Sequence, residues 1–316
     1  MKNLRKKHVP MTDAAAAQAE KERRAAATAK RLETMRANLA ALETRAECIF
    51  QKGEAAIYGT GDGLTAADRR ALLELVNVAY HDSGKIEGIY SVDSCAACDF
   101  CQRMRAASAD NALMICGYCY AAADAWKEAA WRRHKLNARI FGTLLFTVEE
   151  LQTLAIGALC RMNEDGDTVN ETMARNYLRI FAGHPGTRFG YWYKNAPAVA
   201  AGLAAEGIRD RDHLPQNVRF IHSSALIGFP AAPLWFDDAI FTVYPDAETT
   251  LQAVAAGAHE CNGKRCRGCG YFCYTSERQP QPVHIAEVLR ASAAARSVIL
   301  AAYHARLQQA AARCIG

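Results

Sequence analysis

Residues 173–224 have the sequence MARNYLRIFAGHPGTRFGYWYKNAPAVAAGLAAEGIRDRDHLPQNVRFIHSS, in which helical and extended patterns alternate. MARNYLRIFA (173–182) and PAVAAGLAAE (197–206) are predicted helices, whereas RFGYWY (188–193) and NVRFIHSS (217–224) are short apolar runs typical of strands. Parallel strands need long crossover connections, so strands that are separated by helices predict a parallel sheet. The expected fold class is therefore α/β.

The same alternation continues on both sides of this stretch. Further strands are predicted at GIYSV (88–92), ALCRMN (158–163) and AIFTVY (239–244). Further helices are predicted from a capping-box-like start at Thr65 and Asp68 to about Tyr80, at about 120–136, from TVEEL (147–151), at about 247–256, and over 282–312. The order favours a partial (βα) barrel over residues 59–280, with a C-terminal helix over 281–316.

The amino-terminal part, residues 1–58, is predicted to be a helical basic extension that ends near the glycine-rich turn GTGDGL (59–64). Residues 1–52 contain twelve Lys and Arg against six Asp and Glu, a net charge of +6. This helix contacts nucleic acid or an acidic partner in one interpretation, and is a solvated helix in the other. An apolar stripe predicts packing against another helix, in this chain or in a second copy that would make a dimer; it consists of Leu32, Met35, Leu39, Leu42 and Ile49.

The composition excludes several classes of protein. The 316 residues are 51% hydrophobic and 22% charged, which is ordinary for a globular chain and excludes wholesale disorder. No apolar run approaches the ~18 residues that a membrane-spanning helix needs. The basic start is followed by alanines and charges rather than by an apolar signal segment, so a cytoplasmic location without membrane attachment is expected.

Nine of the twelve cysteines fall in two groups. The first group is Cys95, Cys98, Cys101, Cys116 and Cys119, and the second is Cys261, Cys266, Cys269 and Cys273. Clustered thiols in a reducing compartment indicate metal binding more often than disulfides. Cys48, Cys160 and Cys314 stand apart and are predicted to be buried small hydrophobic residues.

The spacing of the cysteines does not decide between iron–sulfur clusters and zinc. The compact C-x4-C-x2-C-x3-C run of the second group suits a [4Fe-4S] cluster, and its glycines let backbone N–H groups approach the sulfurs. Zinc held by paired thiol knuckles is the alternative. The first group has five cysteines, one more than a cubane cluster binds, and the sequence leaves open which of them is not a ligand.

Polar residues follow several of the predicted strands, where parallel sheets bind their ligands. They include Asp93, Ser94, the run from Arg161 to Asp167, Lys194, Asn195 and the run from His222 to Ser224. Both cysteine groups are expected at the same edge of the sheet, which would make that edge an active-site mouth. Ser223 is predicted to bind a ligand or to cap the next turn. Glu164, Asp165 and Asp167 are candidates to face a ligand.

Six stretches together resemble the phage and plasmid proteins of the gene product 88 family, a radical-SAM-like group. They are CGYCYA (116–121), RMNEDGD (161–167), FGYWYKN (189–195), NVRFIHSS (217–224), FTVYPD (241–246) and the second cysteine group. The resemblance implies a radical-SAM type of partial barrel that binds [4Fe-4S] clusters and S-adenosylmethionine, with no settled substrate. Tyr118 takes the place of the aromatic residue before the last cluster cysteine, and the carboxylates of EDGD (164–167) that of the group facing the cofactor's ammonium.

The chain departs from the radical-SAM loop at one position, because Ala112 stands four residues before Cys116 where a cysteine is expected. A third thiolate would then come from the 95–101 stretch. Two hypotheses follow. The first is an enzyme that cleaves S-adenosylmethionine reductively to modify an unidentified substrate. The second is a zinc-stabilised binding or structural module that contacts nucleic acid or protein through the basic helix.

Overall fold

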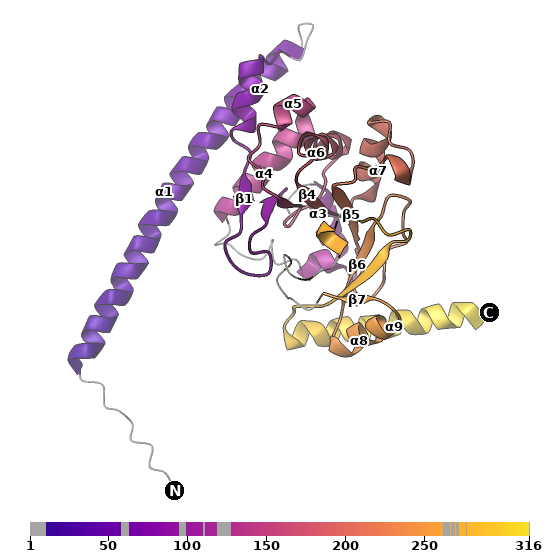
Figure 1. The fold of residues 1–316 in the computed structure, drawn as a ribbon. Helices are drawn as coiled ribbons and strands as arrows, with labels where there is room; N and C mark the ends of the chain where they lie inside the picture. Colours follow the sequence, from indigo (N-terminus) through magenta and orange to yellow (C-terminus); the bar gives the residue numbers. More distant parts are fainter. Residues whose placement is uncertain are drawn as a thin grey trace.

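The fold was analysed in a computed structural model, which describes residues 11–57, 63–94, 99–109, 111–118, 128–261, 266, 269, 272–275 and 277–315. Within these ranges the chain forms one eight-stranded sheet that is flanked by helices (Figure 1). The strands are β1 (Val78–Tyr80), β2 (Tyr90–Val92), β3 (Leu159–Met162), β4 (Arg188–Tyr193), β5 (Val218–Ser223), β6 (Ala239–Tyr244), β7 (His259–Glu260) and β8 (Val283–Val288).

The sheet is mostly parallel, and its strand order is β1-β2-β3-β4-β5-β6-β8-β7. β1 pairs with β2 in antiparallel register, and each of the other pairs is parallel. From β2 to β6 the strands lie side by side in the order of the chain, as they do in (βα) barrels. The predicted α/β class is confirmed.

Most of the predicted helices are present, and residues 120–127, the first part of the helix predicted at about 120–136, lie outside the described residues. They are α1 (Met11–Ile57), α2 (Ala66–Leu73), α3 (Asp99–Ala107), α4 (Glu128–Thr143), α5 (Val148–Leu151), α6 (Glu171–Gly183), α7 (Ala196–Ala205), α8 (Ala247–Ala255) and α9 (Ala293–Ile315). α2 and α5 each begin with a capping box, from Thr65 and Thr147. Short 3-10 turns lie at η1 (Ile115–Tyr118), η4 (Arg211–His213) and η6 (Phe272–Tyr274).

The main hydrophobic core lies between the sheet and the helices α4, α6 and α7. Alternate residues of β3 and β4 point into it, because successive side chains of a strand lie on opposite faces. On β4 these are Phe189, Tyr191 and Tyr193, all of them buried. Phe189 and Tyr191 pack against aromatic rings of α6, with a centroid distance of 4.8 Å between Phe181 and Phe189. We call this side of the sheet the helix face.

The predictions of two helices are partly wrong. Residues 283–288, predicted as the start of the C-terminal helix, form β8 between β6 and β7, and the helix α9 begins only at Ala293. Two neighbouring strands supply the hydrogen bonds of this segment, a tertiary effect that overrides local propensity. The helix that starts after Thr65 ends at Leu73, and Val78–Tyr80 is the edge strand β1.

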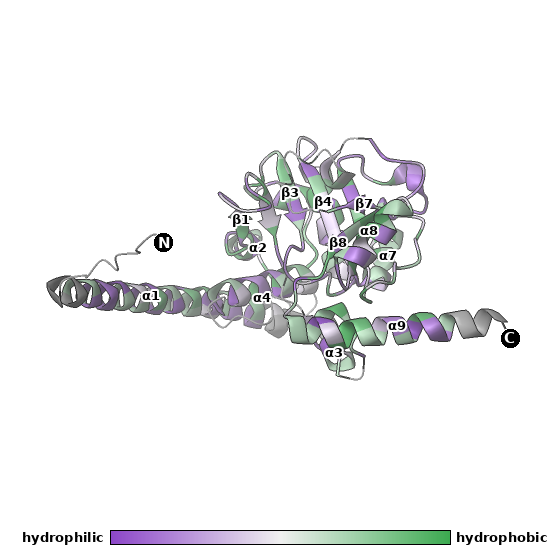
Figure 2. Cartoon of the chain, turned by 90° about the horizontal axis from the view of Figure 1, so that it is seen from below, coloured by the Kyte–Doolittle hydropathy of each residue, from purple (hydrophilic) through white to green (hydrophobic). Residues whose placement is uncertain are grey.

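The long amino-terminal helix is confirmed as α1, but its two halves differ. Leu39 and Ile49 are buried, and ion pairs join Glu43 to Arg132 and Glu47 to Arg139 on α4. Leu32 and Met35 are each 39% exposed, so the amino-terminal half of the predicted stripe does not pack. Figures 1 and 2 show this half extending away from the sheet. Among the described residues, no helix has the length and apolarity to cross a membrane.

Candidate metal centre

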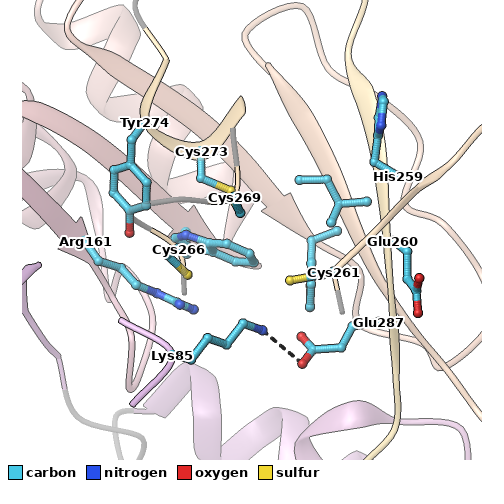
Figure 3. Close-up of a pocket in the computed structure, with 13 residues that line it drawn as sticks. Lys85, Arg161, His259, Glu260, Cys261, Cys266, Cys269, Cys273, Tyr274 and Glu287 are labelled. Carbon is cyan, nitrogen blue, oxygen red and sulfur yellow. Dashed lines mark hydrogen bonds and ion pairs between the residues drawn. The ribbon is translucent and has the colours of Figure 1, made fainter. Parts of the chain in front are cut away.

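The four cysteines of the second group line one cavity, which Figure 3 shows. The cavity has a volume of about 60 Å³. Besides Cys261, Cys266, Cys269 and Cys273, it is lined by Lys85, Arg161, Trp192, Phe241, His259, Glu260, Tyr274, Ile285 and Glu287. The four cysteines are free thiols.

The cavity lies on the face of the sheet opposite the helix face, which we call the inner face. Arg161 of β3 and Trp192 of β4 alternate along their strands with residues of the main core. Phe241 of β6 and Ile285 of β8 also line the cavity and pack in a separate apolar cluster. The sequence predicts the second cysteine group at the carboxyl edge of the sheet, whereas here it covers the inner face.

Backbone contacts hold the cysteines at different points around the cavity. The N–H of Cys261 donates to the carbonyl of Ala286 at 2.7 Å, and that of Cys266 donates to the carbonyl of Lys85, also at 2.7 Å. Cys273 belongs to η6, which packs over β4 at Gly190. A Cβ atom at this glycine would lie 3.0 Å from the carbonyl oxygen of Cys273, so the close approach of η6 favours a residue without a side chain.

Two cationic side chains reach the cavity beside the thiols (Figure 3). The ammonium of Lys85 lies 3.0 Å from a carboxylate oxygen of Glu287. Burial works to lower the pKa of Lys85, but Glu287 and Cys261 outweigh it and raise that pKa. Burial raises the pKa of the Cys273 thiol to about 12, and the positive charge of Arg161 acts against that rise. The two cations alone therefore do not ionise the buried thiols. The cavity favours thiolates only when it holds a further positive charge.

The residues present fit an inorganic group better than an organic ligand. Ligand pockets usually measure ~300–1,000 Å³, several times the volume of this cavity. Soft thiolates select iron–sulfur clusters and zinc. The indole Nε1–H of Trp192, a residue that lines the cavity, is buried and has no hydrogen-bond partner among the described residues, as expected of a donor to a bound group. Among the described residues, no three His, Cys, Asp or Glu side chains converge closely enough for one metal ion.

The first cysteine group lies mostly outside the described residues, which include neither Cys95, Cys98 nor Cys119. The backbone of Cys101 is part of α3, and Cys116 lies in η1, half-buried. The segments that bound the group lie at the carboxyl edge of the sheet. Ser94 follows β2, and the N–H of Ile115 donates to the carbonyl of Ala225, just after β5, at 2.9 Å.

The acidic segment after β3 is a tightly built turn. One carboxylate oxygen of Asp93 accepts from the backbone N–H of Glu164 at 2.7 Å and of Asp165 at 3.2 Å. Gly166 has a φ of +92°, and a Cβ there would lie 2.2 Å from the carbonyl oxygen of Ser94. Asp167 is buried and accepts from the backbone N–H groups of Thr168, Lys194 and Asn195. The carboxylate of Asp167 thus joins β3 to the end of β4.

The other two acidic side chains of the turn approach histidines, which the sequence analysis did not single out. A carboxylate oxygen of Glu164 lies 3.1 Å from Nε2 of His81, and one of Asp165 lies 3.9 Å from Nδ1 of His134. Both histidines are distant from the turn in sequence, at the edge strand and on α4. The pairing of β1, β2 and β3 brings His81 to this edge, and a hydrogen bond of 3.0 Å from Asn137 to the carbonyl of Asp93 holds α4 beside it. No local sequence pattern could have found these histidines.

The two remaining predicted site residues lie on different elements. Tyr118, in η1, donates its hydroxyl hydrogen to the carbonyl of Ala112 at 3.1 Å and packs near α9. Ser223 is buried at the carboxyl end of β5. Among the described residues, the four cysteines of the second group therefore line one cavity, and the other candidates lie along the carboxyl edge of the sheet.

No protein-family model, curated protein or solved structure matched this chain.

Proposed function

We propose that the protein is an iron–sulfur enzyme of the radical-SAM type, with a [4Fe-4S] cluster bound by Cys261, Cys266, Cys269 and Cys273. The observation that carries the proposal is that these four thiols line one cavity together with Arg161 and Lys85. Four thiolates on a cubane cluster give it a net negative charge, and the two cations offset that charge. The buried indole N–H of Trp192 supplies a hydrogen-bond donor of the kind that sulfur ligands accept.

The second group supplies all four ligands of a cubane, so its cluster would have no open iron. Such a cluster suits electron transfer or structure, and S-adenosylmethionine would bind elsewhere. The carboxyl edge of the sheet is the place for it. Ser94, the residue before Cys95, lies there next to the turn that carries Glu164 and Asp165, and Cys116 follows Ile115, which bonds to the segment after β5. A carboxylate is a favourable partner for the ammonium of the methionine moiety.

A cluster in the first group would supply the electron that cleaves the sulfonium of S-adenosylmethionine, with methionine and 5′-deoxyadenosine as the products once hydrogen is abstracted from a substrate. This chain's own part is to orient the cofactor. Glu164 lies where it could accept a hydrogen bond from the ammonium. The backbone turn that Asp93 holds fixes the position of that carboxylate.

The experiment is anaerobic reconstitution with iron and sulfide, followed by reduction with dithionite in the presence of S-adenosylmethionine. We expect a brown protein that releases 5′-deoxyadenosine. Cys116→Ala should abolish the release, whereas Cys160→Ala, a lone buried cysteine of the helix face, should retain it. Full clusters without any 5′-deoxyadenosine would contradict the enzymatic part of the proposal and leave the cluster part standing.

A zinc-stabilised module is the second candidate, because the same thiols suit zinc and α1 projects a basic segment. Residues 16–38 of α1 contain six Lys and Arg against three Glu. Zinc in place of iron, with no visible absorbance, would favour this candidate. A salt-dependent shift of bulk DNA that vanishes when residues 1–52 are deleted would support its nucleic-acid form.

A further inference from the structure

The indole of Trp192 presents a hydrogen-bond donor that the described residues leave unused. Its Nε1–H is buried and has no partner among the described residues, whereas the large majority of buried side-chain polar atoms in native proteins are paired. Trp192 lines the cavity of the four cysteines and packs against the same apolar cluster as Cys261 and Cys273. We therefore expect the acceptor to belong to the group that this cavity binds.

Contacts on several sides hold the indole in place. The guanidinium carbon of Arg161 lies 4.3 Å from the ring centroid, which is a cation–π contact. Phe241 meets the ring edge-on, with centroids 4.8 Å apart. The backbone of Trp192 is fixed as well, because its carbonyl accepts from Nδ2 of Asn163 at 3.0 Å. A ring held in this way keeps its N–H in one direction.

We propose that Nε1–H of Trp192 donates a hydrogen bond to a sulfur of the cluster that the four cysteines hold, and that this bond raises the reduction potential of the cluster. The inference rests on the proposed function and identifies Trp192 as the residue that sets the reduction potential of the cluster. A reduced cluster carries one more negative charge than an oxidised one, so a donor to its sulfurs stabilises the reduced state more. Arg161, stacked on the same ring, adds positive charge on that side.

The test is an EPR-monitored redox titration of the reconstituted full-length protein and of Trp192→Phe. The phenyl ring keeps an aromatic wall and lacks the N–H. We expect unchanged iron and sulfide content and a midpoint potential that is more negative by about 60 mV, which is a tenfold change in the one-electron reduction equilibrium. The matched control is Trp235→Phe, on an exposed tryptophan outside the cavity, which should titrate like the wild type.

The outcomes separate this inference from the proposed function. A wild-type protein that takes up no iron refutes the proposed function. A loaded Trp192→Phe protein with the wild-type potential refutes the inference alone. If Trp192→Phe does not fold or does not hold its cluster, a benzothienylalanine at position 192 decides, because it keeps the two fused rings and replaces the N–H by sulfur. A wild-type potential in that variant would overturn the inference, and a negative shift would support it.

Discussion

The two faces of the sheet differ in whether their buried polar groups have hydrogen-bond partners among the described residues. On the helix face, β4 presents Phe189, Tyr191 and Tyr193 to a closed aromatic core. The polar atoms there have partners within the chain, as in the hydrogen bond of 2.6 Å between the hydroxyls of Tyr191 and Thr168. On the inner face, the same strand presents Gly190 and Trp192 to four free thiols and two cations, and the buried indole N–H of Trp192 has no acceptor among the described residues.

The comparison indicates that the helix face serves stability, and it agrees with our proposal that the inner face holds a group that the polypeptide does not supply. Buried polar groups without partners are rare in native proteins and mark strain, catalysis or a missing ion. Here the unpaired donor and the thiols share one cavity, which favours a missing inorganic group over strain. Substitutions on the inner face should therefore change the metal content, and substitutions on the helix face should change the free energy of unfolding.

The largest expected effect is on metal content. The double variant Cys266→Ala/Cys273→Ala should lose about four iron atoms and four sulfides per chain, because two of the four thiolates of a cubane are gone. The measurement is iron and sulfide analysis after anaerobic reconstitution. Cys160→Ala on the helix face should keep the wild-type content. Equal iron in the double variant and in the wild type would show that this cavity is not the binding site.

A substitution in the core of the helix face should lower the stability of the fold and leave the iron content unchanged. Phe189→Ala removes a fully buried ring that contacts Phe181, and is expected to lower the free energy of unfolding by about 3–5 kcal/mol. Chemical denaturation measures the loss. The protein that remains folded should bind as much iron as the wild type. A loss of metal in proportion to the loss of stability would mean that the two faces are not separable.

A smaller effect is expected at Gly190, where the two faces share one strand. A valine here places its Cβ 3.0 Å from the carbonyl oxygen of Cys273, so η6 must shift, at a cost of about 1–3 kcal/mol. Iron content should fall as well, because the shift moves a proposed ligand. Gly186→Ala is the matched control, since nothing lies within 4 Å of its Cβ position. If Gly190→Val binds iron normally, Cys273 is not a required ligand.

The smallest expected effect is the pH dependence of stability that His81 causes at the carboxyl edge of the sheet. Burial lowers the pKa of His81 below its usual 6.5 in the folded protein. The charged and titratable groups that face it are Asp82, Asp93, Arg161, Glu164 and Asp165. The unfolded chain takes up the proton more readily, so the contribution of His81 to stability is present above pH 6.5 and is lost as pH falls through the folded pKa.

Thermal unfolding of the wild type and of His81→Gln between pH 5 and 8 measures this contribution. The two proteins should differ most in the slope of the melting temperature below pH 6.5, where the variant should be flatter. Parallel slopes over the whole range would show that His81 titrates alike in both states.

Much of the fold could be predicted from the sequence, because the parallel strands are short apolar runs between amphipathic helices. RFGYWY and NVRFIHSS became β4 and β5 almost to the residue. β8 was missed, since VHIAEV directly precedes an alanine-rich helix and only its two neighbouring strands make it extended. The spacing of the second cysteine group indicated that its thiols would gather, but Arg161 and Trp192 lie far away in sequence. Their role depends on strand order, which no local pattern contains.

The most direct test is the metal and inorganic sulfide content of the wild-type protein purified without oxygen, compared with that of Cys266→Ala/Cys273→Ala. Our account predicts iron and sulfide in equal amounts, with about four of each lost in the double variant. Zinc in place of iron, or metal content that is the same in both proteins, would contradict the claim that the inner face holds an iron–sulfur cluster.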